Sequence, residues 1–356
     1  MTGPQLISGS LRDYDWGVVD GLSAWCGATG GPEAELWFGA HPGAPSPTAD
    51  GASTLLDVWG DGSVPLLAKL LAAGSPLSLQ VHPDADTAVR WWSDGEARAL
   101  LADQSEKTEM LVALDPFLVL AGWRPAEQAR TLLAAVGASE PVLAALVLAD
   151  HAAAVRLLLG DHPVSAAADA WDAALTEAGG SDIDRRAMAA VVARFGADPG
   201  VAVAALLAAD LLQPGDAVYV PAGVPHAYVT GLGFEIMNSS DNVLRMGLTA
   251  KPMSVGHTLA ALRPDRTAAI IRRPVDGDYA PAGAPFAVHA QRGGQRKEPT
   301  GVYRLVVCLA GTATVTADDV TVHAIPGQAV ALAAGSTDAL ITADDAIIVR
   351  ATGGRS

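Results

Sequence analysis

The chain has 356 residues, of which 50% are hydrophobic and 17% are charged. This composition buries enough apolar surface to offset the entropy of ordering the chain, which excludes an intrinsically disordered protein. Lysine and arginine total 23 against 39 acidic residues, and the formal net charge of −16 argues against a nucleic-acid partner. The length suits two folded units or one elaborated domain.

The sequence lacks signals for export and for membrane insertion. Apolar runs such as residues 201–209 fall short of the ~20 residues that cross a bilayer, and residues 1–17 lack the order of a signal peptide. We therefore expect a cytoplasmic protein with no membrane partner. Cys26 and Cys308 are the only cysteines, so neither a disulfide framework nor a thiolate metal site is expected.

The pattern of apolar, glycine and proline residues divides the chain into three segments. Up to residue 124, short apolar runs alternate with glycine and proline, with strand-like stretches at residues 76–82 and 110–114. Residues 125–212 are rich in alanine and leucine with scattered charges, which predicts helices. From residue 213 onwards, short apolar runs separated by glycine and proline return, a pattern typical of strands. These patterns predict a mainly β fold with a helical insert.

A faint internal repeat lies in the second half of the chain. PGDAVYVPAGVPH at residues 214–226 aligns with PGQAVALAAGSTD at residues 326–338, so that Gly223 matches Gly335 and His226 matches Asp338. Two copies of one strand–turn–strand unit predict two related β barrels. The first copy resembles the second motif of cupin jelly-rolls, whose histidine usually binds metal. By that resemblance, the second unit has lost this ligand.

Four residues form a candidate metal site. Strand alternation puts Gln80 and His82 on one face of SLQVHP at residues 78–83, Glu109 opens an apolar strand, and His226 ends the first repeat copy. Nitrogen and oxygen ligands with one negative charge suit zinc. Taken singly, His82 before a proline is typical of a turn, and Glu109 of a solvated strand end. We expect the other histidines to be structural or on the surface: His41, His151, His162, His257, His289 and His323.

Five blocks carry a resemblance to the type I phosphomannose isomerase family. They are ELWFGAHPGAPS (35–46), LSLQVHPD (77–84), KTEM (107–110), PHAY (225–228) and SSDNVLRMGLTAK (239–251). The resemblance covers residues 10 to 255 in the family's order. It implies one zinc ion per chain, bound by Gln80, His82, Glu109 and His226, and a small sugar phosphate as partner.

The same resemblance implies two cupin-type jelly-roll β barrels and an α-helical domain. We expect a metal-bearing catalytic jelly-roll from residues 1–124 and 213–255, a helical insert at 125–212, and a degenerate jelly-roll at 256–356. No sequence pattern fixes the oligomeric state, and we expect a monomer or a weak homo-oligomer.

The chain departs from the family pattern at three positions. Ala85 stands where the family commonly has a lysine, and Glu106 and Thr108 replace a histidine and a proline around the Lys-Pro-Glu element. These changes leave the metal ligands in place. They leave open whether the substrate is phosphorylated and which sugar is used.

Interconversion of an aldose and a ketose moves a proton between C1 and C2 through an enediol, which needs an electrophile and a positioned acid/base. Arg245 suits stabilisation of the enediolate or binding of phosphate. Lys107, which is expected to share a strand face with Glu109, and Asp241 are alternative bases. A surface position for Lys107 and a turn-capping role for Asp241 are the competing interpretations.

Three further residues are candidates for substrate binding. Ser78 and Lys251 are available for phosphate, with Lys251 equally suited to solvent, and Glu235 for orienting Arg245 or a ligand. The leading hypothesis is a zinc isomerase of mannose 6-phosphate and fructose 6-phosphate. The alternatives are an iron-dependent cupin oxygenase, against which Gln80 argues, a non-catalytic sugar-phosphate binding protein, and an isomerase of a free sugar.

Overall fold

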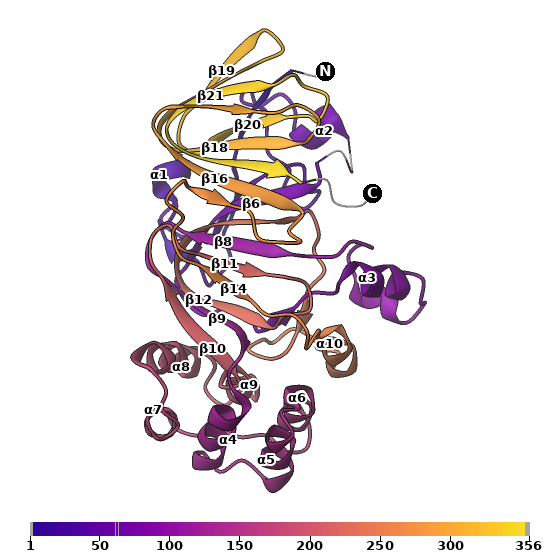
Figure 1. The fold of residues 1–356 in the computed structure, drawn as a ribbon, viewed down its shortest axis with the longest axis vertical. Coiled ribbons are helices and arrows are strands. Elements are labelled where there is room, and N and C mark those ends of the chain that lie inside the picture. The colour runs from indigo at the N-terminus through magenta and orange to yellow at the C-terminus, as the bar shows by residue number, and fades with distance from the viewer. Residues whose placement is uncertain (1–2, 61, 63, 353–356) are drawn as a thin grey trace.

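Two β-sheets and a group of helices are stacked along the long axis of the molecule (Figure 1). The structure is a computed structural model that describes residues 3–60, 62 and 64–352. The sheet nearest the two labelled chain ends is formed mostly by C-terminal residues. The larger sheet follows it, and the helices α4 to α9 lie at the far end (Figure 1). The mainly β fold with added helices agrees with the prediction.

The larger sheet carries the candidate site. Its central order is β14-β11-β8-β12-β6-β5-β2, and β7, β9, β10 and β13 pair beside this path. No closed ring of strands is found among the described residues. The strands are β2 (Ser10–Arg12), β5 (Glu35–Phe38), β6 (Leu66–Ala73), β7 (Gln80–Val81), β8 (Glu109–Ala113), β9 (Phe117–Trp123), β10 (Leu207–Leu212), β11 (Ala217–Val220), β12 (His226–Asn238), β13 (Leu244–Arg245) and β14 (Ala269–Ile271).

The second sheet has the order β1-β20-β18-β21-β16-β15, with β17 paired to β21 and β19 to β18. Its members are β1 (Gln5–Ser8), β15 (Asp278–Tyr279), β16 (Phe286–Arg292), β17 (Gln295–Glu298), β18 (Arg304–Ala317), β19 (Val320–Ala324), β20 (Gln328–Leu332) and β21 (Ala339–Ala351). A separate small ladder joins β3 (Val18–Val19) to β4 (Pro32–Glu33).

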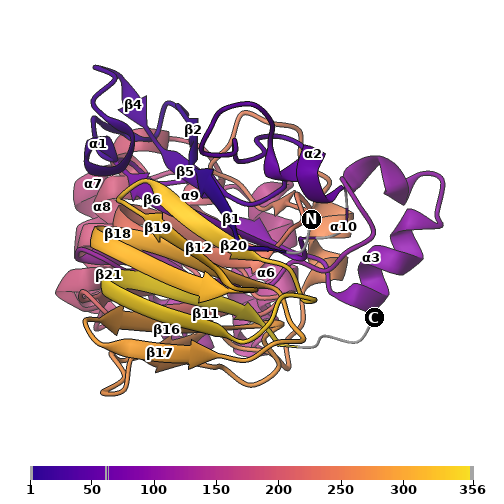
Figure 2. The same cartoon turned by 90° about the horizontal axis from the view of Figure 1, so that it is seen from above.

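Strand β1 belongs to this C-terminal sheet although it is the first element of the chain. It pairs antiparallel with β20, with Gln5 opposite Ala331 (Figure 2). Ile7 of β1 is fully buried in the core between the two sheets. The N-terminal residues therefore connect both sheets, a pairing that no local sequence pattern indicates.

The helices at the far end pack on one another and on β9 and β10 around an alanine- and leucine-rich core. They are α4 (Ala126–Ala135), α5 (Glu140–Val147), α6 (His151–Leu159), α7 (Ala168–Glu177), α8 (Asp182–Phe195) and α9 (Gly200–Ala204). The other helices are α1 (Ser23–Cys26), α2 (Leu55–Trp59), α3 (Ala85–Trp92), a 3₁₀ turn (Ala97–Leu100) and α10 (Val255–Ala261). Among the residues described, no helix has the length and apolar character needed to cross a membrane.

One boundary of the expected helical segment is corrected. The texture of residues 125–212 predicts helix throughout, but helix ends at Ala204 and residues 207–212 form β10, which pairs with β9. The sequence LAADLL has helix-forming residues, and its pairing with a buried neighbouring strand overrides that preference. Similarly, only Gln80–Val81 of the expected strand at 76–82 is a strand.

The repeat units have the same topology in both sheets. The first copy forms β11 and the start of β12, and these strands flank β8. The second copy forms β20 and ends at Asp338, directly before β21, and β20 and β21 flank β18 in the same way. Gly215 and Gly327 begin the copies with φ of +91° and +85°, a conformation that favours glycine. In each sheet, one strand therefore lies between β11 and β12 or between β20 and β21.

Candidate metal centre

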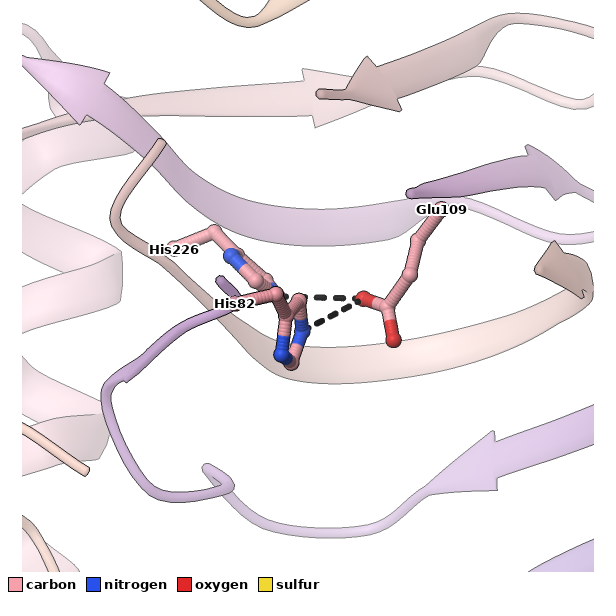
Figure 3. A group of neighbouring side chains, drawn as sticks. All are labelled: His82, Glu109 and His226. Atoms are coloured by element: carbon pink, nitrogen blue, oxygen red, sulfur yellow. Dashed lines mark hydrogen bonds and ion pairs between the residues drawn. The ribbon is translucent and has the colours of Figure 1, made fainter. Parts of the chain in front are cut away.

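Two histidines and a glutamate converge inside the larger sheet (Figure 3). His82 follows β7, Glu109 is the first residue of β8, and His226 is the first residue of β12. All three are buried, with 1 to 3% of their surface exposed. Their ligand atoms all lie within 4.8 Å of one another, and this is the only such group found in the described part of the chain.

Backbone hydrogen bonds orient both imidazoles. His82 Nδ1 lies 2.8 Å from the Asn242 carbonyl oxygen and His226 Nδ1 lies 3.1 Å from the Val224 carbonyl oxygen. A carbonyl oxygen can only accept, so each Nδ1 carries a proton, and each ring, when neutral, presents the Nε2 lone pair. Such contacts are typical of metal-binding histidines.

The presented lone pairs face a carboxylate. Glu109 Oε2 lies 3.1 Å from His226 Nε2 and 3.4 Å from His82 Nε2. Two acceptors at this distance repel each other unless a cation lies between them or a proton is taken up. His82 Nε2 is also buried without a hydrogen-bond partner. The donor set therefore fits a zinc-like cation.

The protonation states agree with this interpretation. Burial and the Lys107 ammonium lower the pKa of His82 to about 4, so the ring is neutral at neutral pH. Burial raises the pKa of Glu109, but the Lys107 ammonium opposes this effect, and the pKa of Glu109 is held well below the usual range. Lys107 Nζ lies 2.8 Å from Glu109 Oε1, which leaves Oε2 facing the histidines. Lys107 is buried beside the centre and is not a surface lysine.

Strand register brings Gln80 and Arg245 to the same face. Gln80 stands opposite both His226 on β12 and Arg245 on β13. Residues directly opposite in antiparallel strands project to the same side, so these three side chains share one face. The Ser78 hydroxyl lies 3.5 Å from Gln80 Nε2. Burial lowers the pKa of Arg245, and its guanidinium makes no ion pair among the described residues.

A β-bulge adds Glu235 to this face. Nine positions separate Glu235 from His226, so simple alternation would put them on opposite faces. The register of β12 against β9 shifts between Tyr228 and Thr230, and this irregularity restores the alignment. Glu235, Tyr228 and His226 accordingly line one small cavity of about 60 Å³ with Gln80 and Glu109.

The same cavity holds a charged cluster in which Glu235 meets Lys69 and Glu35, neither of which was predicted as a site residue. Lys69 Nζ of β6 lies 3.0 Å from Glu235 Oε2 and 3.4 Å from Glu35 Oε1. Trp37 donates its Nε1–H to Glu35 Oε2 at 2.8 Å, and its ring lies 4.9 Å from Lys69 Nζ. Burial raises the pKa of Glu235 and Lys69 opposes that effect. Glu235 thus pairs with Lys69 rather than with Arg245.

Asp241 lies on the exposed side of this cluster. Its carboxylate is half exposed, and Oδ2 lies 3.2 Å from Nε2 of the buried His41. The hydrogen bond from His41 lowers the pKa of Asp241, and the charges of Lys107 and Lys69 act in the same direction. Lys251 is exposed, and among the described residues its one hydrogen bond is from its backbone N–H to Thr249 Oγ1. The structure therefore does not bring Lys251 into the buried cluster.

Two turns fix the backbone of the centre. The buried Asn242 amide bonds the chain at Ala102, Asp103 and Ser105, which holds the carbonyl that orients His82. Gly223, with φ of +88°, donates its N–H to the His82 carbonyl oxygen at 2.8 Å. A Cβ at Gly223 would lie 2.4 Å from the Arg263 side chain, so glycine is required there.

A larger cavity of about 820 Å³ lies between the two sheets. Its lining includes Trp25, Tyr279 and Ile347, and it shares no residue with the small cavity at the histidines. The chemistry-bearing cluster therefore lies in the smaller and more polar space.

Comparisons with known proteins agree with one another. Residues 5–126 match the description "Phosphomannose isomerase type I, catalytic domain". The chain is 28% identical over 294 residues to the mannose-6-phosphate isomerase of Escherichia coli K12, covering 73% of this chain and 74% of that protein. It is also 28% identical over 312 residues to the human mannose-6-phosphate isomerase, covering 72% of each.

Solved structures show the same fold. The Salmonella typhimurium mannose 6-phosphate isomerase, bound to its substrate fructose 6-phosphate and to zinc, superposes with a TM-score of 0.79 at 24% identity, covering 98% of this chain and 100% of that one. Its apo form gives a TM-score of 0.80 at 23% identity, covering 99% of this chain and 100% of that one.

Proposed function

We propose that this chain, a relative of the type I phosphomannose isomerases as its motifs predict, is a zinc-dependent mannose-6-phosphate isomerase. The observation that carries the proposal is the buried convergence of His82, Glu109 and His226, with two imidazole lone pairs facing one carboxylate. The substrate class is a small sugar phosphate, interconverted between mannose 6-phosphate and fructose 6-phosphate.

Gln80, His82, Glu109 and His226 would hold the zinc ion. When bound, zinc supplies a Lewis acid that polarises the oxygens of the sugar. Gln80 belongs to this set because its backbone pairs with His226 and its side chain lies on the same face. Lys107 keeps Glu109 ionised through the 2.8 Å ion pair, so its main role is to position the ligand carboxylate.

Asp241 is the preferred acid/base. The His41 hydrogen bond lowers its pKa, so the carboxylate is ionised at neutral pH and can accept a proton. It takes the C2 proton of mannose 6-phosphate and returns it to C1 of the enediol, while O1 gains a proton and O2 loses one, so that the aldehyde becomes the ketone. Arg245, fixed opposite Gln80, stabilises negative charge that develops on the sugar oxygens. Lys107 remains the alternative base.

The remaining candidates have binding roles in this scheme. Ser78, beside Gln80, is suited to a substrate hydroxyl or phosphate oxygen. Glu235 and Lys69 close the inner end of the cavity with a charged pair that orients sugar hydroxyls. Lys251 is exposed and suits an electrostatic contact with phosphate from outside the buried cluster.

The domain scheme is proposed in the same terms. A metal-bearing cupin jelly-roll comprises residues 1–124 and 213–255, a helical insert lies within 125–212, and a degenerate jelly-roll spans 256–356. The equivalent placement of β8 between β11 and β12, and of β18 between β20 and β21, supports two related units. The exchange of β1 into the second sheet modifies the scheme at its N-terminal end.

Compartment and assembly are proposed separately. The exposed thiol of Cys26 and the buried thiol of Cys308 are both unpaired, which suits a reducing compartment such as the cytoplasm. For the oligomeric state, we propose a monomer or a weak homo-oligomer.

The test is a coupled isomerase assay on the purified protein. Mannose 6-phosphate and free mannose are offered in parallel, before and after chelation and after return of zinc. We expect turnover of the phosphorylated sugar that chelation abolishes and zinc restores. Turnover of free mannose alone would assign the Ala85 departure to a changed substrate. The absence of either activity in fully zinc-loaded protein would contradict the proposal.

A further inference from the structure

His41 is buried at the edge of the candidate site, with 6% of its surface exposed. Its tautomer is fixed, because the Gly43 N–H donates to Nδ1 at 3.1 Å. The proton of a neutral ring therefore sits on Nε2, the nitrogen that lies 3.2 Å from Asp241 Oδ2. The Trp37 ring meets the imidazole edge-on at a centroid distance of 5.1 Å, which limits rotation of His41.

Asp241 has few other restraints. Its side chain is half exposed, and no other side-chain hydrogen bond of its carboxylate is found in the described part of the chain. Its backbone N–H donates to Asp103 Oδ2 at 3.3 Å. The charged groups that face it are His41 from the 39–46 loop, Lys69 from β6, Lys107 before β8, and Asp103 from the preceding loop. Only His41 directs the carboxylate through a side-chain hydrogen bond.

We propose that His41 is a positioning residue that holds the Asp241 carboxylate in place for the proton transfer. The inference rests on the proposed isomerase function and adds a residue to it. Trp37 connects His41 to the buried cluster, because the same indole donates to Glu35 and lies against Lys69. His41 thus joins the half-exposed acid/base to the rigid inner face of the sheet.

Two substitutions separate the hydrogen bond from packing. His41→Leu keeps apolar volume and loses the donor, whereas His41→Gln places an amide N–H near the position of Nε2. For His41→Leu we expect kcat to fall about tenfold, with KM changed much less, because a positioned acid/base is lost. We expect His41→Gln to recover most of the lost activity. His323→Leu, at an exposed histidine of β19, is the control variant.

The pH profile and a double-mutant cycle test whether the loss of His41 lowers activity through Asp241. Loss of the donor raises the pKa of Asp241, so the acidic limb of kcat/KM moves to higher pH in His41→Leu. In an Asp241→Asn background, His41→Leu should cause no further loss of activity. An equal loss in both backgrounds, or an unmoved acidic limb, would overturn the proposal.

A measurement without turnover separates this inference from the proposed function. In zinc-loaded protein with ¹³C-labelled aspartate, the Asp241 carboxyl resonance is identified by its loss in Asp241→Asn. We expect it to titrate at lower pH in the parent chain and in His41→Gln than in His41→Leu. Identical titration in all three would reject the His41 contact, even if the isomerase assay succeeds. The expected shift with no isomerase activity would support the contact and reject the proposed reaction.

Discussion

Lys69 is the least expected residue of the site. It stands alone in the apolar sequence LLAKLLAA of β6, where every residue is buried. An ammonium in such a strand is costly unless opposite charges surround it, and Glu35 and Glu235 supply them. A single lysine in an otherwise apolar strand is therefore a signal for a buried charged site.

Lys69→Met leaves two buried carboxylates without their cation. At pH 7 we expect the free energy of unfolding of zinc-free protein to fall by about 3–5 kcal/mol, the usual cost of breaking a buried ion pair. Without Lys69 the pKa of Glu235, already raised by burial, rises further. The folded variant then binds more protons than the unfolded chain, so its stability recovers as the pH falls from 7 towards 5.

Urea denaturation of both proteins at pH 7 and pH 5.5 measures this difference. Lys69→Arg retains the charge and serves as the control. Adding Glu235→Gln to Lys69→Met removes one unpaired carboxylate and should restore part of the lost stability. Equal unfolding midpoints for the parent chain and Lys69→Met at pH 7 would show that the ion pairs of Lys69 contribute nothing to stability.

At the scale of elements, the site depends on how strands meet rather than on any one strand. Gln80, Glu109 and His226 could be predicted because each lies in a short motif with a local pattern. The contribution of Glu235 depends on a bulge in β12, and that of His41 on a loop that meets Asp241. Such contacts form only when distant segments fold together, so alternation and propensity could not predict them.

The helices are attached to the sheet by a buried ion pair. Arg124, directly after β9, donates from Nη2 to Asp184 Oδ1 of α8 at 2.7 Å and to the Leu207 carbonyl oxygen at 3.2 Å. Arg124 is 2% exposed. Asp184 also completes the capping box of α8 with Ser181. This contact links β9, β10 and α8 at the point where the chain returns from helix to strand.

Asp184→Asn removes the charge that compensates Arg124. We expect a loss of about 3–5 kcal/mol in the free energy of unfolding at pH 7. For Ser181→Ala, which removes the capping hydroxyl and its hydrogen bond to Asp184 but keeps the ion pair with Arg124, we expect about 1 kcal/mol. Burial raises the pKa of Asp184, but Arg124 and Ser181 outweigh it and lower the pKa overall. The stabilisation is therefore present above the usual carboxyl pKa and is lost as the pH falls below it.

Denaturant unfolding of the three proteins from pH 7 to pH 3.5 measures this prediction. The difference in the free energy of unfolding between the parent chain and Asp184→Asn should become smaller as the pH falls towards 3.5. A difference that stays constant across this range would contradict the assigned ion pair.

Over the whole molecule, the two sheets share one apolar core. Leu36, Phe38 and Phe234 of the larger sheet pack in the same cluster as Phe286 and Leu305 of the C-terminal sheet. The composition patterns of the sequence predicted a mainly β chain with a helical insert, because secondary structure depends largely on local patterns. They did not predict how the sheets stack, since that arrangement depends on contacts between residues far apart in the chain.

A shared core predicts that both sheets unfold together. Ile7 is fully buried between them. We therefore expect Ile7→Ala to lower the free energy of unfolding by about 2–5 kcal/mol. Unfolding of Ile7→Ala, followed by circular dichroism, tryptophan fluorescence and zinc release, should give one coincident transition at lower denaturant. Val320→Ala, at an exposed position of β19, is the control. Two separate transitions would mean that the sheets are independent.

The pairing of β1 with β20 has a consequence for synthesis on the ribosome. Residues 5–8 are translated about 320 residues before their partner, residues 328–332. The first strand must therefore remain unpaired while residues 9–327 are made, with its hydrogen-bonding groups open to wrong partners. The larger sheet can begin to assemble during translation, but the C-terminal sheet gains its edge strand only after residues 328–332 have been made.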